Sequence, residues 1–480
     1  MYCGYVTTLK NVRQHPNADR MKLADCFGNT VCVGLDAAEG DVVIYFPTDG
    51  QLSVEYCAQN DLVRRKDKNG NPAGGYLEPD KRNIRAIKLR GEKSDGLVMP
   101  LESLAYTGIK MEELTIGTQI TVVNGHEICQ KYIPKSNARP ARAEGNKTRK
   151  KKVPIAPLFQ EHADTEQLAY NLSAFKPGDE IEITLKMHGT SQRTAYVPVL
   201  KGYKRSLWDK IMRRDGTPIY EYGYVSGTRR VVLDSYDGGF YGSNEFREQH
   251  AKTFEGKLWK GETVYYEVIG FTHTGAPIMA SADNKKISDK EFVNQYGKET
   301  VFSYGCEPNG LVEGEYLKVE HNWKKYGEAR LILKPQSDIY VYRMTMTNED
   351  GNVVEYTPDF MRYRCEQIGV KTVPVLWRAN IPHTLADMDS AIPGARFLLQ
   401  EYEHAGEFIK SVAEQYYDGP DPIGKTHVRE GVVVRILNRP KFTAYKHKNH
   451  TFKMLSGIIV EQAENSGITD AMDADILSEM

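Results

Sequence analysis

The sequence of 480 residues lacks the features of a membrane protein and of a disulfide-linked secreted protein. No apolar run is long enough to cross a bilayer, and the first residues carry neither the basic segment nor the apolar core of a secretory signal. The seven cysteines are odd in number and scattered, and none forms a Cys-x-x-Cys pair, which argues against a disulfide framework and a structural zinc site. We therefore expect a soluble, cytoplasmic monomer without a membrane partner, whose cysteines are buried thiols.

An excess of one charge is also absent from the chain as a whole, because 63 Lys and Arg balance 64 Asp and Glu. The distribution is nevertheless uneven. Residues 131–152 carry nine Lys or Arg and one acid, Glu144, whereas residues 457–480 carry acids and no bases. A local basic segment of this kind indicates a polyanion bound at that segment. A flexible tether is an equally acceptable interpretation of the same residues.

The length is about three times that of a typical domain, which favours two domains. Short apolar runs separated by turn signals fill the first 130 residues, a pattern typical of a small β-barrel. The strands expected there are 4–9, 21–26, 30–35, 41–46, 84–89 and 96–99, with a turn-like loop over 90–95.

After residue 153, strands and helices are mixed rather than strictly alternating, which favours an α+β fold. The strands expected there are 179–186, 222–226, 263–269, 339–345, 431–436 and 441–446, and the helices are 243–254 and 395–415. We therefore predict an N-terminal β-barrel over 1–130, a basic linker over 131–152, a second domain over 153–456 and an acidic tail over 457–480.

One lysine and one acid, far apart in the chain, form a chemically suggestive set with two later lysines. Lys186 follows an apolar alternation, Glu430 precedes a run of valines, and Lys446 and Lys448 alternate along a later strand, so that both face one side. A lysine that attacks phosphorus must be uncharged, and burial or neighbouring cations favour the uncharged amine. Taken alone, a Lys-x-x-Gly sequence is common and more often marks a surface lysine before a turn.

Two acids and two further residues extend this set. Glu267 lies in an apolar strand and Glu430 at the mouth of another, and a buried carboxylate is usually paired or bound to a metal. A structural ion pair is the alternative for both acids. Gly189 allows close backbone approach to a nucleotide, and Arg193 is suited to its sugar or phosphate.

Two segments of the first domain resemble the tRNA-binding OB modules. The run HPNADRMK at residues 15–22 matches their opening motif, with Met21 in the leucine place. Leu89-Arg90-Gly91 with Ser94 and Gly96 matches a later turn of these modules. The resemblance implies an OB-fold barrel that binds single strands or nucleic-acid backbone. A barrel that serves only for docking is the alternative.

The second domain resembles the covalent nucleotidyltransferases, the superfamily of polynucleotide ligases and mRNA capping enzymes. The matching segments are Lys186-Met187-His188-Gly189, Ser226-Gly227-Thr228-Arg229, Tyr266-Glu267, residues 338–343, Glu430-Gly431-Val432-Val433 and Lys446-His447-Lys448. His188 departs from the aspartate usual in DNA ligases and capping enzymes and agrees with the Lys-x-His-Gly-Thr-Ser form of RNA ligases. The OB module ahead of the catalytic domain, with the segments at 161–166 and 304–306, resembles the nick-sealing RNA ligases. The segments at 310–331 and 382–421 are longer than the core needs and have no assigned role.

The resemblance implies an antiparallel-sheet ligase adenylation domain that uses ATP with Mg²⁺ or Mn²⁺ and acts on RNA or on an RNA/DNA nicked duplex. It implies that Lys186 forms lysyl-AMP, with Glu430, Lys446 and Lys448 as catalytic partners and with Glu430 and Glu267 as metal ligands. The residues implied for the nucleotide are Glu267, Arg193, Gly189, Tyr340, Tyr342, Lys446 and Lys448, and those implied for the nucleic acid are Arg229, Thr190 and Ser191. Core packing is the alternative for either tyrosine.

Three other functions share parts of this pattern. A capping guanylyltransferase has the reactive lysine but carries its OB module after the catalytic domain and uses GTP. A DNA ligase has the same chemistry but normally an aspartate at the position of His188. The third is a nucleic-acid-binding protein whose nucleotidyltransferase domain is silent, and the intact set of lysines and acids argues against it.

Overall fold

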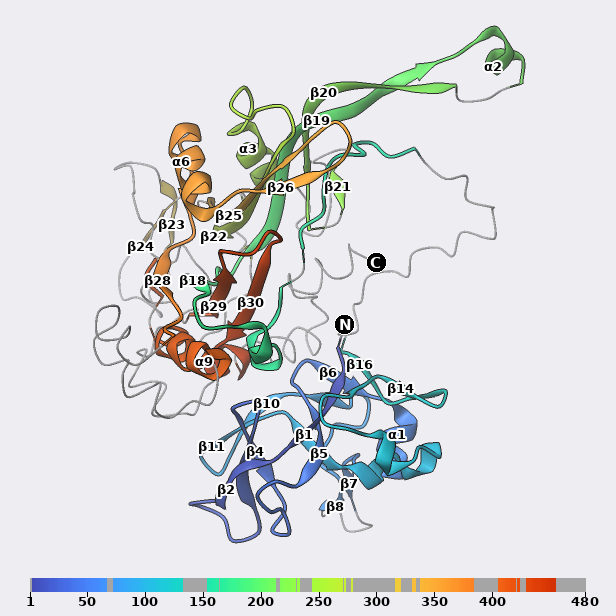
Figure 1. Ribbon diagram of the computed structural model, residues 1–480, viewed down its shortest axis with the longest axis vertical. Coiled ribbons are helices and arrows are strands. Elements are labelled where there is room, and N and C mark those ends of the chain that lie inside the picture. The colour runs from blue at the N-terminus through green and yellow to red at the C-terminus, as the bar shows by residue number, and fades with distance from the viewer. Residues whose placement is uncertain are drawn as a thin grey trace. The chain divides into compact units, whose positions relative to one another are not determined.

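Two compact units make up the computed structural model (Figure 1). The first comprises Met1–Lys135 with His450–Gln462, and the second comprises Ser136–Asn449 with Ala463–Met480. The structure describes residues 2–66, 72–132, 153–163, 165–212, 216–229, 231–233, 244–270, 272, 278, 316–320, 330–333, 337–383, 405–419, 421–423 and 429–454. The domain boundaries expected from sequence stay predictions.

Several features expected from sequence lie outside the described residues. These are the basic linker beyond Tyr132, the acidic tail, the segment at 304–306, most of 310–331, residues 384–404 and Asp164.

The first unit consists of short strands with a few helical turns. The strands are β1 Gly4–Thr8, β2 Lys10–Gln14, β3 Lys22–Cys26, β4 Asn29–Val33, β5 Val42–Phe46, β6 Gly50–Leu52, β7 Arg65–Lys66, β8 Pro72–Gly74, β9 Asn83–Ile84, β10 Ala86–Leu89, β11 Glu92–Asp95, β12 Leu97–Pro100, β13 Gln119–Ile120, β14 Val122–Val123, β15 His126–Glu127 and β16 Cys129–Lys131. The helical elements are α1 Val54–Gln59 and the 3-10 turns Leu101–Thr107 and Met111–Glu113.

The larger sheets of this unit have the strand orders β12-β5-β1-β13, β2-β3-β4 and β16-β6-β9. Their strand pairs are antiparallel. Within the described residues the ladders do not join into one closed barrel, so the OB barrel stays a prediction.

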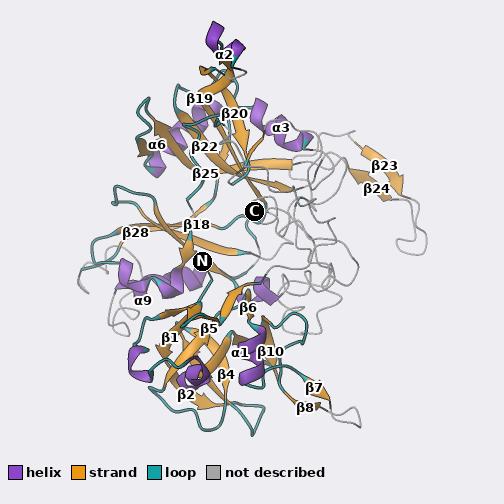
Figure 2. Ribbon diagram, turned by 90° about the vertical axis from the view of Figure 1, so that its right-hand side faces the viewer, coloured by secondary structure: helices purple, strands orange, loops and turns teal. Residues whose placement is uncertain are grey.

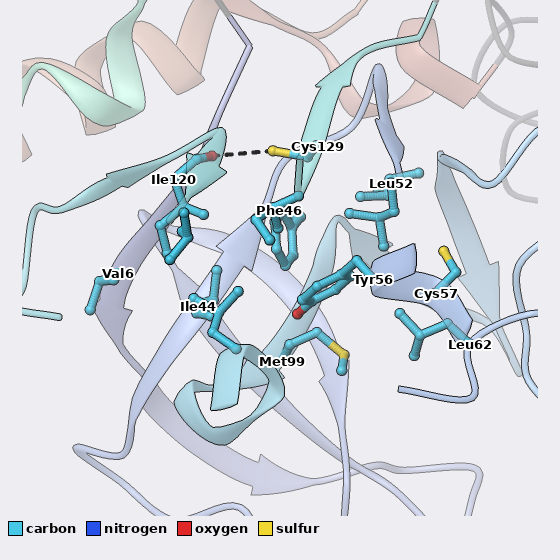
Figure 3. Packing of buried hydrophobic residues seen from close by; sticks show 14 of the residues in the cluster. Val6, Ile44, Phe46, Leu52, Tyr56, Cys57, Leu62, Met99, Ile120 and Cys129 are labelled. Carbon is cyan, nitrogen blue, oxygen red and sulfur yellow. Dashed lines mark hydrogen bonds between the residues drawn. The ribbon is translucent and has the colours of Figure 1, made fainter. Parts of the chain in front are cut away.

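One apolar core holds the first unit together. Val6 from β1, Ile44 and Phe46 from β5, and Tyr56 from α1 are fully buried in it (Figure 3). The hydroxyl of Tyr56 lies 2.7 Å from Oγ of Ser103, so this core tyrosine keeps a hydrogen-bond partner. Four consecutive residues of β5, from Val43 to Phe46, are buried, so this strand is covered on both faces.

The expectation of a loop over 90–95 is wrong. Strands β10 and β11 form a hairpin there, with Leu89 opposite Glu92. Its two-residue turn is Arg90-Gly91, and both residues have positive φ, 47° and 93°. This backbone matches the twist of the flanking strands and favours glycine at the second position. Because residues 92 and 93 are charged, the hydrophobicity of the sequence does not predict the second strand.

The second unit has a mixed α+β fold, and its strands and helices are longer. The strands are β17 Glu166–Gln167, β18 Glu180–Leu185, β19 Thr190–Lys204, β20 Thr217–Gly227, β21 Val232–Leu233, β22 Glu262–Gly270, β23 Tyr316–Glu320, β24 Arg330–Leu333, β25 Ser337–Thr347, β26 Val353–Glu355, β27 Lys371–Thr372, β28 Val375–Asn380, β29 Gly431–Ile436 and β30 Thr443–Lys448. The helices are α2 Leu207–Ile211, α3 Glu245–Lys252, α6 Pro358–Ile368 and α9 Ala405–Tyr416, with 3-10 turns at Leu168–Tyr170 and Leu172–Ala174.

Two mostly antiparallel sheets form the body of this unit (Figures 1 and 2). The five-stranded sheet has the order β17-β30-β29-β18-β28. The seven-stranded sheet runs β21-β20-β19-β22-β25-β26, with β27 beside β25. Only the short strands β17 and β27 pair in parallel among these described strands. The α+β class expected from sequence is confirmed.

Helices cover one face of each sheet. Phe408 and Val412 of α9 pack against Ile183 and Val434 of the five-stranded sheet. On the seven-stranded sheet, Phe246 of α3 and Met361 and Cys365 of α6 pack against the face that carries Val264, Tyr266 and Val268 of β22. Since side chains alternate along a strand, Tyr265 and Glu267 lie on the opposite face.

Among the described residues, no helix has the length and apolar character needed to cross a membrane. Six of the seven cysteines lie in the described part of the chain, all as free thiols, and five of these six are buried.

Candidate active site

The segment 186–189 connects the two sheets of the second unit. β18 of the five-stranded sheet ends at Leu185, and β19 of the seven-stranded sheet begins at Thr190. The backbone N–H of Lys186 donates a 3.0 Å hydrogen bond to the carbonyl of Gly431. The lysine is therefore fixed at the place where one sheet passes into the other.

Strand register brings three distant residues to this place. Leu185 lies opposite Val432, and Gly431 lies opposite Lys448. The end of β18, the start of β29 and the end of β30 thus meet at one edge. Glu430, which precedes β29, is held there by the N–H of Asn449, which donates to its carbonyl at 2.9 Å.

The carboxylate of Glu430 is surrounded by basic side chains. Its Oε1 lies 2.6 Å from Nζ of Lys186 and 3.4 Å from Nζ of Lys448. Its Oε2 lies 3.5 Å from Nδ1 of His188. Lys186, Glu430 and Lys448, separated by about 250 residues of sequence, therefore form one cluster.

Electrostatics favour the charged form of this buried acid. The side chain of Glu430 is only 5% exposed. Burial pushes its pKa upward, but the charges of Lys186 and Lys448 and the hydrogen bond from His188 outweigh burial and hold the pKa well below its usual range. The carboxylate of Glu430 therefore stays ionised within this cluster.

Two glycines allow the backbone to approach closely around the cluster. A Cβ at Gly189 would collide with the carbonyl of Val268 and lie 2.9 Å from Cγ of Glu267. Gly431 has φ of 144°, and a Cβ there would collide with the carbonyl of His447. Glycine is required at both positions, which explains the glycine that follows each of the two motifs.

Lys446 and His447 lie on opposite faces of β30. Lys446 is half-buried opposite Val433, on the same face as Lys448 and roughly 7 Å further along the strand. His447 points the other way, where Nε2 lies 3.2 Å from Oε1 of Glu414 and the ring stacks on Tyr417 at 4.9 Å. The lysine pair therefore shares the face of Glu430, whereas the histidine belongs to the packing under α9.

A buried apolar cluster, called the apolar floor below, adjoins Lys186. Leu185, Met187, Ile269 and Val373 form a buried cluster against which Tyr340 and Tyr342 are packed. Tyr340 lies opposite Glu267, and Glu267 lies opposite Ser191, in the ladder of the seven-stranded sheet. These residues combine a flat apolar surface with a carboxylate.

Ser191 and Tyr342 are joined across the sheet. The hydroxyl oxygen of Tyr342 lies 2.9 Å from Oγ of Ser191. Burial, followed by the charge of Glu267, raises the pKa of Tyr342, so its hydroxyl remains protonated and able to donate.

His162 is a residue of this face to which sequence analysis assigned no role. Its ring lies 5.0 Å from that of Tyr342 and 5.6 Å from that of Tyr265. Burial, followed by the charges of Arg229, Arg343 and Arg193, holds its pKa well below the usual range and keeps the imidazole neutral. The resemblance at 161–166 was the available signal, but a histidine in an irregular segment has no periodicity that reveals its contacts.

The two arginines expected at the site differ in their surroundings. Arg193 is almost fully buried, donates to the carbonyl of Gln160 and lies 4.2 Å from the ring of Phe159. Arg229 is half-buried, and its carbonyl accepts from the N–H of His162. Arg193 thus braces the segment that carries His162, and Arg229 remains the more accessible cation.

Thr190 faces away from the other site residues. It is fully buried, and its hydroxyl accepts a 2.6 Å hydrogen bond from Arg247 of α3. Arg247 also donates to the carbonyl of Ser191 at 3.1 Å. Direct contact with a nucleic acid, expected for Thr190, does not fit this burial, because alternation along β19 points Ser191 and Thr190 to opposite faces.

The donors available for a divalent cation are carboxylates. Within the described residues, no three His, Cys, Asp or Glu side chains gather as a metal cluster. Mg²⁺ is commonly held by one or two carboxylates together with substrate phosphates. Glu430 and Glu267 fit that donor chemistry, with Glu430 already bound by two ammonium groups that a cation would displace.

Comparisons with known proteins give structural likeness alone. No protein-family model matches the sequence, and no curated protein matches it. A structure of Naegleria gruberi RNA ligase with pyrophosphate is similar over 94% of this chain and 97% of that chain, with a TM-score of 0.49 and 15% identity. A mutant of that ligase with ATP and Mn covers the same shares at a TM-score of 0.49 and 14% identity. A further mutant without ligand covers 96% of this chain and 98% of its own, with a TM-score of 0.48 and 14% identity.

Proposed function

We propose that this chain is an ATP-dependent RNA ligase that joins a 3′-hydroxyl RNA end to a 5′-phosphate across a nick in an RNA-containing duplex. The observation that supports it most is the convergence of Lys186, Lys448 and His188 on the buried carboxylate of Glu430. Here a single buried acid is matched by two lysines at the junction of two sheets, next to an apolar floor.

In the first step, Nζ of Lys186 attacks the α-phosphorus of ATP. The bond from that phosphorus to the bridging oxygen breaks, pyrophosphate leaves, the amine gives up a proton, and lysyl-AMP remains. Lys448 and Lys446, on one face of β30, neutralise the α-phosphate during this transfer, which depends mainly on positioning and charge.

The resting ion pair must open before Lys186 can react, because a protonated amine has no free electron pair. Glu430 and Glu267 are the residues that would hold a divalent cation, which would supply positive charge to the phosphates. Glu430 is the group whose contact with Lys186 must open. His188 keeps the carboxylate oriented through its 3.5 Å approach to Oε2.

The nucleotide occupies the apolar floor beside Lys186. Tyr340 and Tyr342 line that floor, so one of them stacks on adenine, and Glu267 is placed for the ribose hydroxyls. Gly189 lets the backbone pass close to the sugar. Arg193 acts through the segment 159–162 that it braces.

The later steps consume the adenylate. An oxygen of the 5′-phosphate end attacks the phosphorus of lysyl-AMP and frees Lys186. The 3′-hydroxyl then attacks the 5′-phosphorus, and AMP leaves. Arg229 is assigned to the 5′-phosphate, and the N-terminal unit to the duplex as an OB module.

A sealing assay on nicked duplexes tests this function. Each of the three strands is supplied in turn as RNA or DNA, with ATP and Mg²⁺. We expect sealing when the 3′-hydroxyl strand ends in RNA. Sealing of all-DNA nicks at the same rate would favour a DNA ligase, and a GTP adduct without sealing would favour a capping enzyme. Duplex binding without any nucleotide adduct would identify a silent binding protein.

A further inference from the structure

A two-stranded hairpin extends well beyond the sheet that contains the candidate site. β19 pairs with β22 only from Thr190 to Ala195, but pairs with β20 as far as Lys204 opposite Thr217. Both views show this hairpin projecting from the unit with α2 at its end (Figures 1 and 2). Residues 200–220 are called the projecting hairpin below. A ribbon of this length without a third strand buries little and needs another reason to exist.

The end of the projecting hairpin displays large apolar side chains. Leu207 is 78% exposed, Trp208 is 74% exposed and Met212 is 56% exposed. Tyr203 and Ile219 are also exposed on the strands below them. Single exposed apolar residues are common, but a tryptophan gathered with other large apolar residues at one extremity marks an interaction site.

Local hydrogen bonds hold this end in shape. The N–H and Oγ of Ser206 both donate to Oδ2 of Asp209, at 2.9 and 2.6 Å, and the N–H of Asp209 donates to Oγ of Ser206 at 3.1 Å. This reciprocal arrangement is a capping box at the start of α2. Leu207 and Trp208 lie between the two capping residues, so the turn presents them outward in a defined position.

The projecting hairpin is basic although the whole chain is not. Its sequence from 201 to 219 contains six Lys or Arg and two acids, whereas the chain has a net charge of −1. Lys201, Lys204 and Arg205 are exposed, and the carboxylate of Asp209 is engaged by the cap. Lys201 sits where the register shifts between Leu200 and Gly202, a bulge that turns its side chain out of the regular alternation.

We propose that the projecting hairpin is a second nucleic-acid contact, which binds the double-stranded arm of the nicked substrate away from the adenylation pocket. Lys201 and Lys204 bind phosphates, and Leu207 and Trp208 lie in the minor groove. The minor groove of an A-form duplex is wide and shallow, so the end of the hairpin fits into it. Apolar side chains that act as wedges at a minor groove are a known mode of contact with nucleic acids. This inference rests on the proposed ligase function.

The charge and the size of the hairpin end favour a nucleic-acid duplex over a membrane or a protein partner. A membrane-bound element needs an extended amphipathic face, and α2 spans five residues. The exposed cations Lys201 and Lys204 lie on the strand that leads to Leu207 and Trp208, and their charges match a polyanion with a groove. A membrane and a protein partner are therefore outcomes for the test.

The register supplies a clean deletion. Leu200 lies directly opposite Tyr220, so replacing residues 201–219 by Asn-Gly closes the ladder with a two-residue turn. Two point variants keep the hairpin: Leu207→Ser with Trp208→Ala, and Lys201→Glu with Lys204→Glu. Val354→Ser is the matched control, because Val354 is an exposed apolar residue elsewhere on the unit.

Fluorescence anisotropy with a labelled nicked RNA duplex, at several salt concentrations, measures the effect. We expect the deletion to weaken binding at least tenfold and the double lysine variant to reduce the salt slope by about two, since each lost phosphate contact removes roughly one unit. The control should bind like the wild type. Lysyl-AMP formation should be unchanged in all variants, which also shows that they are folded.

Unchanged duplex affinity and salt slope in both point variants would overturn the inference. So would hairpin-dependent binding to anionic phosphatidylserine vesicles with no change in duplex binding, or hairpin-dependent binding to a protein alone. If the wild-type chain forms no lysyl-AMP, the proposed function fails instead, and the binding data still decide on the hairpin.

Discussion

Nζ of Lys186 lies 2.6 Å from Oε1 of Glu430, and Nζ of Lys448 approaches the same oxygen at 3.4 Å. One carboxylate oxygen therefore restrains both the proposed nucleophile and one of the proposed phosphate-binding lysines. Releasing that oxygen frees two positive charges at once, next to the place where a triphosphate is expected to bind. The following predictions test this relationship and the surrounding fold.

Replacing Glu430 by Gln should reduce lysyl-AMP formation by about a hundredfold or more, the range seen when one preorganised electrostatic contact is lost. The amide keeps the shape of the side chain but lacks the negative charge with which Glu430 is proposed to hold a divalent cation. Single-turnover labelling with α-labelled ATP measures the rate. Glu414→Gln is the control, because Glu414 pairs with His447 and Lys410 on the other face of the sheet. Equal rates in the two variants would contradict the role of Glu430.

Gly189→Ala should lower the adenylylation rate by about two orders of magnitude, since its Cβ collides with the carbonyl of Val268 and shifts the segment that holds Lys186. Gly202 lies in β19, the strand that follows this segment, and a Cβ there meets no atom within 4 Å, so Gly202→Ala should react like the wild type. Circular dichroism should show both variants folded. A fully active Gly189→Ala variant would show that this segment tolerates displacement.

The sequence predicted the two motifs of this cluster because each is a local pattern. Leu185 and the valines after Gly431 mark buried strands, and the glycines mark close approach, so the positions of Lys186 and Glu430 follow from their neighbours. Their contact does not follow, because it depends on the pairing of β18 with β29 across about 250 residues. The family resemblance, rather than periodicity, joined them.

Tyr342→Phe and Ser191→Ala should each raise the KM for ATP severalfold, because the two hydroxyls lie 2.9 Å apart beside the apolar floor. The free-energy change calculated from KM should be smaller for the double variant than the sum of the changes for the two single variants. We expect a coupling energy of about 1 kcal/mol, the net contribution of one hydrogen bond. The measurement is a double-mutant cycle on KM. Strict additivity would mean that the bond does not organise the nucleotide site.

His250 should make the second unit less stable in mild acid. Burial lowers the pKa of His250 to about 4, and its Nε2 lies 2.8 Å from Oγ of Ser337. The unfolded chain takes up a proton near pH 6.5 and the folded chain does not, so folding stability falls as pH decreases from 6.5 to about 4. The loss amounts to about 3 kcal/mol.

Thermal unfolding of the wild type and of His250→Gln between pH 7.5 and 4 checks this dependence. The midpoint of the variant should decline less steeply below pH 6.5. Parallel curves for the two proteins would show that His250 is protonated in the folded state.

The long hairpin and the buried arginine show where sequence analysis stops. β19 was not predicted, because its 15 residues mix polar, apolar and glycine positions without a clear period of two. Thr190 and Ser191 are both expected to contact the substrate, yet their side chains point to opposite faces of β19. Which of the two faces the site depends on the residue at which the strand begins. Arg193 is expected from sequence to contact the sugar or phosphate of a nucleotide, whereas in the structure it is buried against the ring of Phe159 and the carbonyl of Gln160.

The identity of the reacting amine tests the central claim most directly. The wild-type chain is incubated with ATP and Mg²⁺, digested at neutral to alkaline pH and analysed by mass spectrometry, with Lys186→Ala and Lys201→Ala treated in parallel. We predict an adenosine monophosphate adduct on the peptide that contains Lys186, in the wild type and in Lys201→Ala but not in Lys186→Ala. An adduct on another lysine, or one that persists in Lys186→Ala, would contradict the account.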